Sequence, residues 1–273
     1  MRSVGWGAAK ILRDYYRGKH DLDINQEKYD SPVTAADKAA NEYILKSLQK
    51  VFTPDQFGYL SEETYQSNAV YPQEWVWIID PLDGTREFIE KKDEYAIHIA
   101  LIKDGTPCLA VVVIPEAQKL YFAAKGEGTY LETPDGGITP VKVSDKNRIE
   151  QLYLVASRSH RDDRLSAIIK SIPFQGEKSV GSVGCKIATI LSQEADVYIS
   201  LSGKSAPKDW DFAAPELVLT EAGGKFTTFS AQSPRYNRGD VNQWGGFIAS
   251  NGACQEQLCE MARNALEPIE GKV

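Results

Sequence analysis

Two aspartates, Asp80 and Asp83, stand three residues apart in the segment DPLDGT. The segment follows the apolar run WVWII, a pattern that is typical of a buried strand. Both carboxylates therefore lie at the end of one strand, where they offer the oxygen ligands that Mg²⁺ prefers and shares with a phosphate group. Gly84 allows a phosphate to approach the backbone, and the amides near Thr85 can donate to it. An ordinary turn is the alternative, because Pro, Asp and Gly are common turn residues. The spacing favours the metal site.

Three further acidic segments lie at the ends of predicted elements. The pair Glu62 and Glu63 follows a strand-like run, and Asp211 begins an apolar helical pattern. Thr34 and Asp37 precede a second helical pattern and have the spacing of a capping box. Each segment has a simpler explanation, namely a solvated strand end, a carboxylate at a helix N-terminus, or a cap. Taken one at a time, the simpler explanations are favoured.

Taken together, the acidic segments resemble the inositol monophosphatase superfamily of metal-dependent, lithium-sensitive phosphatases. Within it, the chain is most similar to the 3'(2'),5'-bisphosphate nucleotidases of the bacterial CysQ type. The resemblance runs from about residue 6 to about residue 265, and four blocks follow the family's order: residues 30–37, 61–63, 80–88 and 210–215. It implies a layered α-β-α-β-α sandwich, of mixed α+β and α/β character, with the active site between the two halves.

The resemblance also implies a metal ligand set. One Mg²⁺ would be bound by Glu62, Asp80 and the Leu82 carbonyl, and a second by Asp80, Asp83 and Asp211. A third, weaker ion would lie near Glu62. Inhibition by Li⁺ is implied in the same way.

Two residues match the catalytic pair of the family. Thr85 matches the residue that orients the attacking water, and Asp37 matches the carboxylate that pairs with it. The histidines at positions 20, 98 and 160 are scattered along the chain, and neither a Ser-His-Asp set nor a Cys nucleophile motif is evident. We therefore expect no covalent intermediate.

The substrate site is predicted from basic residues and from the resemblance. Residues 202–208 are basic where the inositol enzymes carry an acidic residue, and lysines there suit a second phosphate better than a neutral polyol. Residues 157–160 and 181–182 resemble substrate-contacting segments of the nucleotidases. A solvated surface charge is the alternative for each lysine or arginine. The predicted substrate-binding residues are Gly84, Thr85, Arg86, Ser159, His160, Gly181, Ser182 and Lys204.

The expected reaction is Mg²⁺-dependent hydrolysis of 3'-phosphoadenosine 5'-phosphate to AMP and phosphate. The sulfated analogue PAPS, which would give APS, is the expected second substrate. One alternative is a broader phosphatase that acts on inositol monophosphates or fructose 1,6-bisphosphate. Another is a catalytically silent Mg²⁺ or nucleotide sensor on the same fold, against which the complete set of acidic residues argues.

Composition narrows the class of protein further. The 273 residues are 42% hydrophobic, which supports a sizeable core, and a formal net charge of −7 argues against a general nucleic-acid-binding surface. The four cysteines form no CxxC motif, so we expect reduced thiols and a cytoplasmic location. The chain shows neither the apolar core of a signal peptide nor an apolar run of the ~20 residues that span a bilayer. Both a monomer and a homodimer remain open.

The hydrophobic patterns predict two domains, residues 1–147 and 148–273, divided at the polar stretch 144–151. The first domain should open with a helix over 4–15, a polar loop over about 19–31 and a helix from about residue 37, followed mainly by strands over 59–143, the last at 141–143. The second should alternate strands at 152–156, 197–201, 225–228 and 247–249 with helices at 163–171, 185–192, 211–222 and 255–266.

Overall fold

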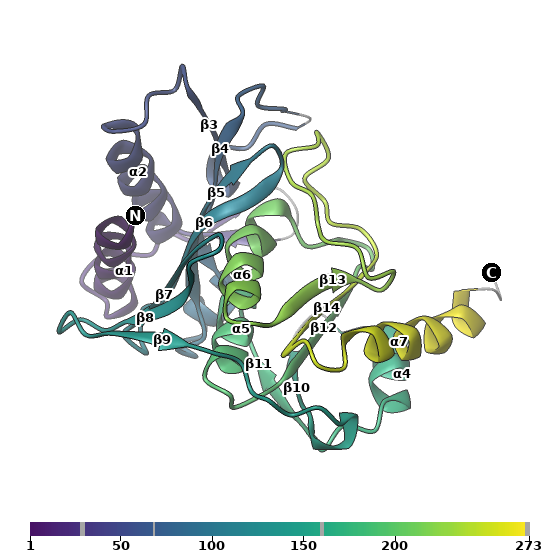
Figure 1. The fold of residues 1–273 in the computed structure, drawn as a ribbon. Helices are drawn as coiled ribbons and strands as arrows, with labels where there is room; N and C mark the ends of the chain where they lie inside the picture. The colour runs from purple at the N-terminus through teal and green to yellow at the C-terminus, as the bar shows by residue number, and fades with distance from the viewer. Residues whose placement is uncertain (28–30, 68, 159–160, 271–273) are drawn as a thin grey trace.

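The structure is a computed structural model that describes residues 1–27, 31–67, 69–158 and 161–270. Helices and sheets alternate in five layers (Figure 1). Helices α1 (Arg2–Tyr16) and α2 (Ala35–Gln49) cover the outer face of a seven-stranded sheet. Helices α5 (Val183–Leu191) and α6 (Asp209–Glu221) lie between this sheet and a five-stranded one, whose far face carries α4 (Asp163–Ser171) and α7 (Gln255–Glu270). The predicted α-β-α-β-α sandwich is confirmed.

The seven-stranded sheet carries the DPLDGT segment at the end of its second strand. Its strands, in spatial order, are β3 (Phe57–Ser61), β4 (Trp75–Asp83), β5 (Ala96–Lys103), β6 (Thr106–Ile114), β7 (Lys119–Ala124), β8 (Gly128–Glu132) and β9 (Ile138–Val141). Strand β4 runs parallel to β3 and antiparallel to β5, with Asp80 opposite His98. The register then shifts between Asp80 and Asp83. Pro81 lies within this shift, where its missing N–H costs no ladder bond.

The five-stranded sheet has the spatial order β11 (Gly176–Val180), β10 (Tyr153–Ser157), β12 (Val197–Leu201), β14 (Gly246–Ser250) and β13 (Lys225–Thr228). Strands β11, β10 and β12 are parallel, and β14 runs antiparallel to β12 and β13. The carboxyl ends of the three parallel strands therefore meet at one edge. The segments that leave this edge include residues 181–182 and 202–208, two of the predicted substrate-binding stretches.

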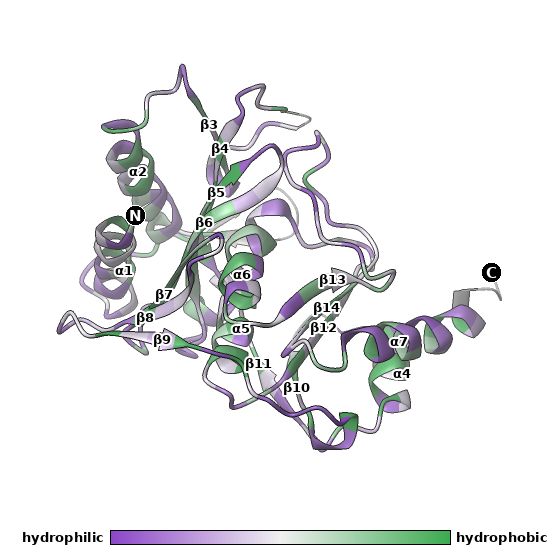
Figure 2. Ribbon diagram, viewed as in Figure 1, coloured by the Kyte–Doolittle hydropathy of each residue, from purple (hydrophilic) through white to green (hydrophobic). Residues whose placement is uncertain are grey.

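Helix α6 is buried between the two sheets along most of its length. Its side chains belong to a core cluster that draws on both sheets: the cluster contains Phe212 together with Val112 of β6 and Tyr198 of β12. Figure 2 shows hydrophobic residues along both central helices, whereas the outer helices are hydrophilic where they face solvent. A helix that is apolar on most sides must be covered on most sides. This position places the first turn of α6 next to the end of β4.

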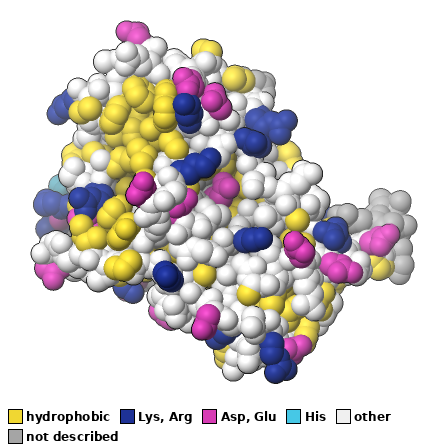
Figure 3. Space-filling view, in the orientation of Figure 1, with side chains coloured by type: hydrophobic (Ala, Val, Ile, Leu, Met, Phe, Trp, Pro, Cys, Tyr) yellow, Lys and Arg dark blue, Asp and Glu magenta, His cyan; other side chains and the backbone are white. Residues whose placement is uncertain are grey.

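On the surface, acidic and basic side chains are interspersed over the face shown in Figure 3, and apolar side chains gather where α2 covers the seven-stranded sheet. Within the described part of the chain, no helix combines the length and the apolar character needed to cross a bilayer.

Most predicted elements are present, and the differences have local causes. Helix α2 begins at Ala35 rather than near residue 37, because Thr34 is its N-cap. The strand predicted at 141–143 is β9, at 138–141. The expected loop contains the short pair β1 (Asn25–Glu27) and β2 (Ser31–Val33). Strand β11 and the five-residue helix α3 (Thr85–Ile89) were not predicted, because one is a charged edge strand and the other is too short to show a period. The domain division at residue 147 stays a prediction.

Candidate metal centre

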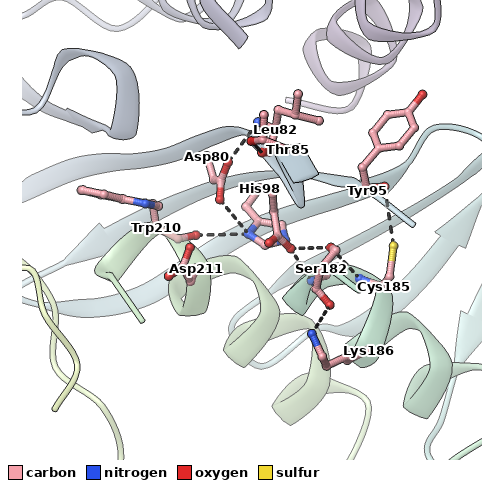
Figure 4. Close-up of polar contacts among 12 residues, drawn as sticks. Asp80, Leu82, Thr85, Tyr95, His98, Ser182, Cys185, Lys186, Trp210 and Asp211 are labelled. Carbon is pink, nitrogen blue, oxygen red and sulfur yellow. Dashed lines mark hydrogen bonds and ion pairs between the residues drawn. The ribbon is translucent and has the colours of Figure 1, made fainter. Parts of the chain in front are cut away.

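Three carboxylates from two elements meet at the end of β4. Asp80 and Asp83 come from the strand itself, and Asp211 comes from the first turn of α6. One oxygen from each carboxylate lies within 4.8 Å of the others. Figure 4 shows Asp80 and Asp211 on the same side of the His98 imidazole, the side that also faces Trp210. The structure therefore brings together three of the predicted metal ligands from distant parts of the sequence.

Each of these carboxylates is held in place by a backbone amide. Asp80 Oδ1 accepts from Leu82 N at 3.0 Å, and Asp211 Oδ2 accepts from Lys208 N at 2.6 Å. Asp83 Oδ2 accepts from Gly184 N at 2.7 Å and also from the Ser182 hydroxyl. These hydrogen bonds hold one oxygen of each carboxylate and so set the orientation of the carboxylate. Hydrogen bonds from neighbouring groups commonly orient metal ligands in this way.

Glu62 lies next to this trio, in the 3₁₀ turn η1 (Glu62–Thr64) that follows β3. Burial, and then the nearby charge of Asp211, raises the pKa of Glu62 well above its usual range. Burial, and then Glu62, does the same to the pKa of Asp80, and burial followed by Asp83 raises the pKa of Asp211 to about 6. Four crowded carboxylates with hard oxygen donors fit a divalent cation of the Mg²⁺ or Ca²⁺ kind. The cluster can therefore bind a metal ion.

The pKa of Asp83 moves in the opposite direction. Burial alone would raise it, but the adjacent His98 and the hydrogen bond from Ser182 hold it at about 2. Asp83 is thus the carboxylate of the group whose charge the protein itself stabilises most.

Asp37 and Thr85 are in direct contact, as the resemblance implies. Asp37 Oδ2 accepts from Thr34 N at 2.8 Å and from Thr34 Oγ1 at 2.6 Å, which completes the capping box of α2. Asp37 Oδ1 lies 3.3 Å from Thr85 Oγ1, which is also 3.1 Å from the Leu82 carbonyl oxygen. Burial raises the pKa of Asp37 to about 6. One oxygen of Asp37 therefore caps helix α2, and the other contacts Thr85 in the DPLDGT turn.

Gly84 joins β4 to α3 in a conformation that suits glycine. Its φ is +90°, and a Cβ at this position would lie 2.9 Å from the Glu94 carbonyl oxygen. Arg86 follows on α3, where it is exposed. Both the positive φ and the nearby Glu94 carbonyl therefore require glycine at this position of the turn.

Of the remaining predicted substrate residues, Gly181, Ser182 and Lys204 follow the carboxyl ends of strands in the five-stranded sheet. Gly181 N donates to Glu94 Oε2 at 2.7 Å, and the Ser182 hydroxyl donates to Asp83. Lys204 is exposed in the loop before α6. Ser159 and His160 lie outside the described residues. Contact between any of these residues and a substrate stays a prediction.

Two residues that the sequence reasoning passed over belong to the site. His98 is 1% exposed on β5, with Nε2 3.2 Å from Asp83 Oδ2. Lys186 is 4% exposed on α5; its Nζ donates to Ser182 O at 2.8 Å, and burial lowers its pKa. The available indication was the same for both, namely a polar residue with apolar neighbours inside a mainly apolar element, AIHIALIK or VGCKIATIL. The three histidines are scattered along the sequence, but strand pairing places His98 opposite Asp80.

The layered fold and its carboxylate site define a class of phosphatase. The model of the inositol monophosphatase family matches residues 2–267, and the chain belongs to this family. A 3'(2'),5'-bisphosphate nucleotidase CysQ of Salmonella typhimurium is 35% identical over 218 residues, which cover 79% of this chain and 84% of the relative. An inositol-1-monophosphatase of Bacillus subtilis is 29% identical over 73% of both chains.

Solved structures agree with this assignment. An inositol monophosphatase of Thermotoga maritima has a TM-score of 0.81 at 22% identity, over 98% of this chain and 96% of the other, and it supports the fold alone. CysQ from Bacteroides thetaiotaomicron, described as a bacterial member of the inositol monophosphatase family, has a TM-score of 0.74 at 29% identity, over 90% of this chain and 94% of the other. Family membership supports a phosphomonoesterase activity on small phosphorylated molecules.

Proposed function

We propose that this protein hydrolyses 3'-phosphoadenosine 5'-phosphate to AMP and phosphate with the help of Mg²⁺. PAPS is the second substrate in this proposal, and Li⁺ the expected inhibitor. The observation that carries the proposal is the meeting of Asp80, Asp83 and Asp211 within 4.8 Å, with the Asp37–Thr85 pair bonded to the same DPLDGT turn. The three aspartates would bind the metal ion, and the Thr85 hydroxyl beside them would bind the attacking water.

The ligand set would consist of Glu62, Asp80, Asp83, Asp211 and the Leu82 carbonyl. Bound there, Mg²⁺ supplies charge neutralisation for a phosphate group and activation of a water molecule. The protein's own contribution is preorganisation, because the amides of Leu82, Gly184 and Lys208 hold the carboxylates before substrate arrives.

In this proposal, Thr85 orients the attacking water and Asp37 receives its proton. The Thr85 hydroxyl has one proton, which it donates either to Asp37 Oδ1 or to the Leu82 carbonyl. Its oxygen lone pairs then accept a hydrogen bond from water and fix the direction of attack. Asp37, with a pKa of about 6, is suited to receive a proton near neutral pH through this hydroxyl.

The choice of a nucleotide substrate rests on the similarity to CysQ nucleotidases and on the basic edge of the five-stranded sheet. Lys204 is exposed there, and Arg158 lies at the same edge, held by Glu94 at 2.7 and 2.8 Å. Basic groups at this edge suit a substrate with a second phosphate. A broader sugar phosphatase is the second candidate, because the Bacillus subtilis inositol-1-monophosphatase is 29% identical.

The test is phosphate release from 3'-phosphoadenosine 5'-phosphate, inositol 1-phosphate and fructose 1,6-bisphosphate, each with Mg²⁺ and with EDTA. The proposal predicts rapid release from the nucleotide only, and only with Mg²⁺. Comparable release from all three esters would favour the broader phosphatase. No release from any of them, with Mg²⁺ binding intact, would favour the sensor.

A further inference from the structure

The imidazole of His98 contacts both elements that carry the aspartates. Its Nδ1 lies 3.1 Å from the Trp210 carbonyl oxygen, in the first turn of α6 and next to Asp211. The same Nδ1 is 4.0 Å from Asp80 Oδ2, while Nε2 is 3.2 Å from Asp83 Oδ2. The ring is 1% exposed, so water does not replace these contacts. In Figure 4, His98 lies between Asp80, Trp210 and Ser182.

The contact with Trp210 requires a proton on Nδ1 of the ring. A carbonyl oxygen can only accept, so Nδ1 must carry the proton and donate. This bond links the middle of β5 to the start of α6, two elements that are far apart in the sequence. It holds the residue that precedes Asp211 at a set distance from the end of β4.

The second nitrogen is the less expected feature. The described residues give His98 Nε2 no hydrogen bond of acceptable direction, although Asp83 Oδ2 is close. A histidine kept only for the stability of the core would satisfy both nitrogens, because an unpaired buried polar atom costs about 1–3 kcal/mol. The neighbouring α5 also leaves room for the ring, since a Cβ on Gly184 would lie 2.4 Å from Nε2. The fold thus makes room for an imidazole although one of its nitrogens makes no hydrogen bond with the described residues, so core stability alone does not explain its presence.

We propose that His98 is a positioning residue of the metal centre. Its imidazole joins β5 to the first turn of α6 and faces Asp83, and in this way it sets the separation of Asp83 and Asp211 that a divalent cation requires. The inference rests on the proposed function of the carboxylate cluster as a metal site. It does not depend on which phosphate ester is the substrate.

The experiment is calorimetric titration of the metal-free protein with Mg²⁺, without substrate. The variants are His98→Leu and His98→Asn. Both side chains branch at Cγ, and only the amide can donate to the Trp210 carbonyl. Outer partners of metal ligands typically contribute about 10–100-fold in affinity, so His98→Leu should weaken Mg²⁺ binding by this factor. His98→Asn keeps the bond to Trp210 and loses the contact with Asp83, so its loss should be smaller.

Val112→Ala is the matched control. Val112 is buried directly opposite His98 on β6, so its truncation disturbs the same part of the core without touching a carboxylate. This variant should lower the melting temperature and leave the Mg²⁺ affinity unchanged. If His98→Leu does not fold, His98→Ala, which adds no bulk, replaces it.

Three results would overturn the inference: a folded donor-free variant with the parent's Mg²⁺ affinity, equal losses in the leucine and asparagine variants, or an equal loss in Val112→Ala. A parent protein that binds no Mg²⁺ would overturn both this inference and the proposed function. If the parent binds Mg²⁺ but hydrolyses none of the esters, only the proposed reaction would be refuted. The order of Mg²⁺ affinities among the His98 variants would still support the inference.

Discussion

Replacement of Glu216 by Gln should stabilise the protein at alkaline pH and have little effect at acidic pH. Glu216 is 8% exposed on α6, between the two sheets, and its Oε2 accepts from the Tyr236 hydroxyl at 2.6 Å. Burial raises the pKa of this carboxyl to about 7, against the opposing effects of the Tyr236 hydrogen bond and of Arg235 and Lys125. The native state therefore favours the neutral acid.

The sign and the size follow from this shift. The unfolded chain releases the proton near the ordinary pKa of 4.5, and the folded protein near 7. Between these pH values the native state binds more protons, so the free energy of unfolding falls as pH rises from about 4.5 to about 7. At about 1.4 kcal/mol per pH unit, the loss reaches at most about 3 kcal/mol above pH 7. Gln keeps an acceptor for Tyr236 and cannot ionise, so Glu216→Gln removes this loss.

Urea unfolding of the metal-free parent and variant at pH 5, 6, 7 and 8 measures the effect. The difference in free energy of unfolding should be at most about 1 kcal/mol at pH 5 and grow toward about 3 kcal/mol at pH 8. Tyr236→Phe is the control, because it removes the donor that stabilises the ionised carboxylate and should destabilise the protein more at pH 8 than at pH 5. A difference between parent and Glu216→Gln that is constant over this pH range would refute the reasoning.

Three further predictions concern the site. Asp83→Asn should lower the turnover number at least ~100-fold in the phosphate-release assay, the usual loss for one electrostatic stabiliser, and near-normal Mg²⁺-dependent turnover would contradict its role as a ligand. Asp37→Ala should reduce kcat more than it raises KM in steady-state kinetics, and a rise in KM alone would indicate a binding role. Gly84→Ala should lower the free energy of unfolding by about 1–2 kcal/mol in urea titrations. The reason is that φ is +90° and the new Cβ would lie 2.9 Å from the Glu94 carbonyl oxygen. Unchanged stability would show that the turn can rearrange.

The local features of the site were predictable because neighbouring residues determine them. The run WVWII followed by DPLDGT predicts a buried strand that ends in carboxylates, and β4 extends through Asp83. Thr34 and Asp37 predict a capping box, which is present at the start of α2. Helical periodicity likewise identified α1, α4 and α7, each of which has one apolar face.

Other features carried no local pattern. Strand β11, with the sequence GEKSV, forms because it pairs in parallel with β10 at the sheet edge, where polar side chains meet solvent. Glu216 and Tyr236 lie 20 residues apart, and nothing near either one in the sequence indicates that they form a buried pair. His98 is a polar residue with apolar neighbours on its strand, and such a residue is usually part of the core.

The sequence by itself determined the chemistry available to this protein: acidic side chains at strand and helix ends, a glycine where a turn needs positive φ, and the order of blocks that marks the family. Only the tertiary structure decided that Asp211 meets Asp80 and Asp83 within 4.8 Å, and that His98 lies beside Asp83. The physical reason is that these distances depend on the burial of α6 between two sheets and on the register of β4 with β5. Both result from packing over the whole chain, which short stretches of sequence do not encode.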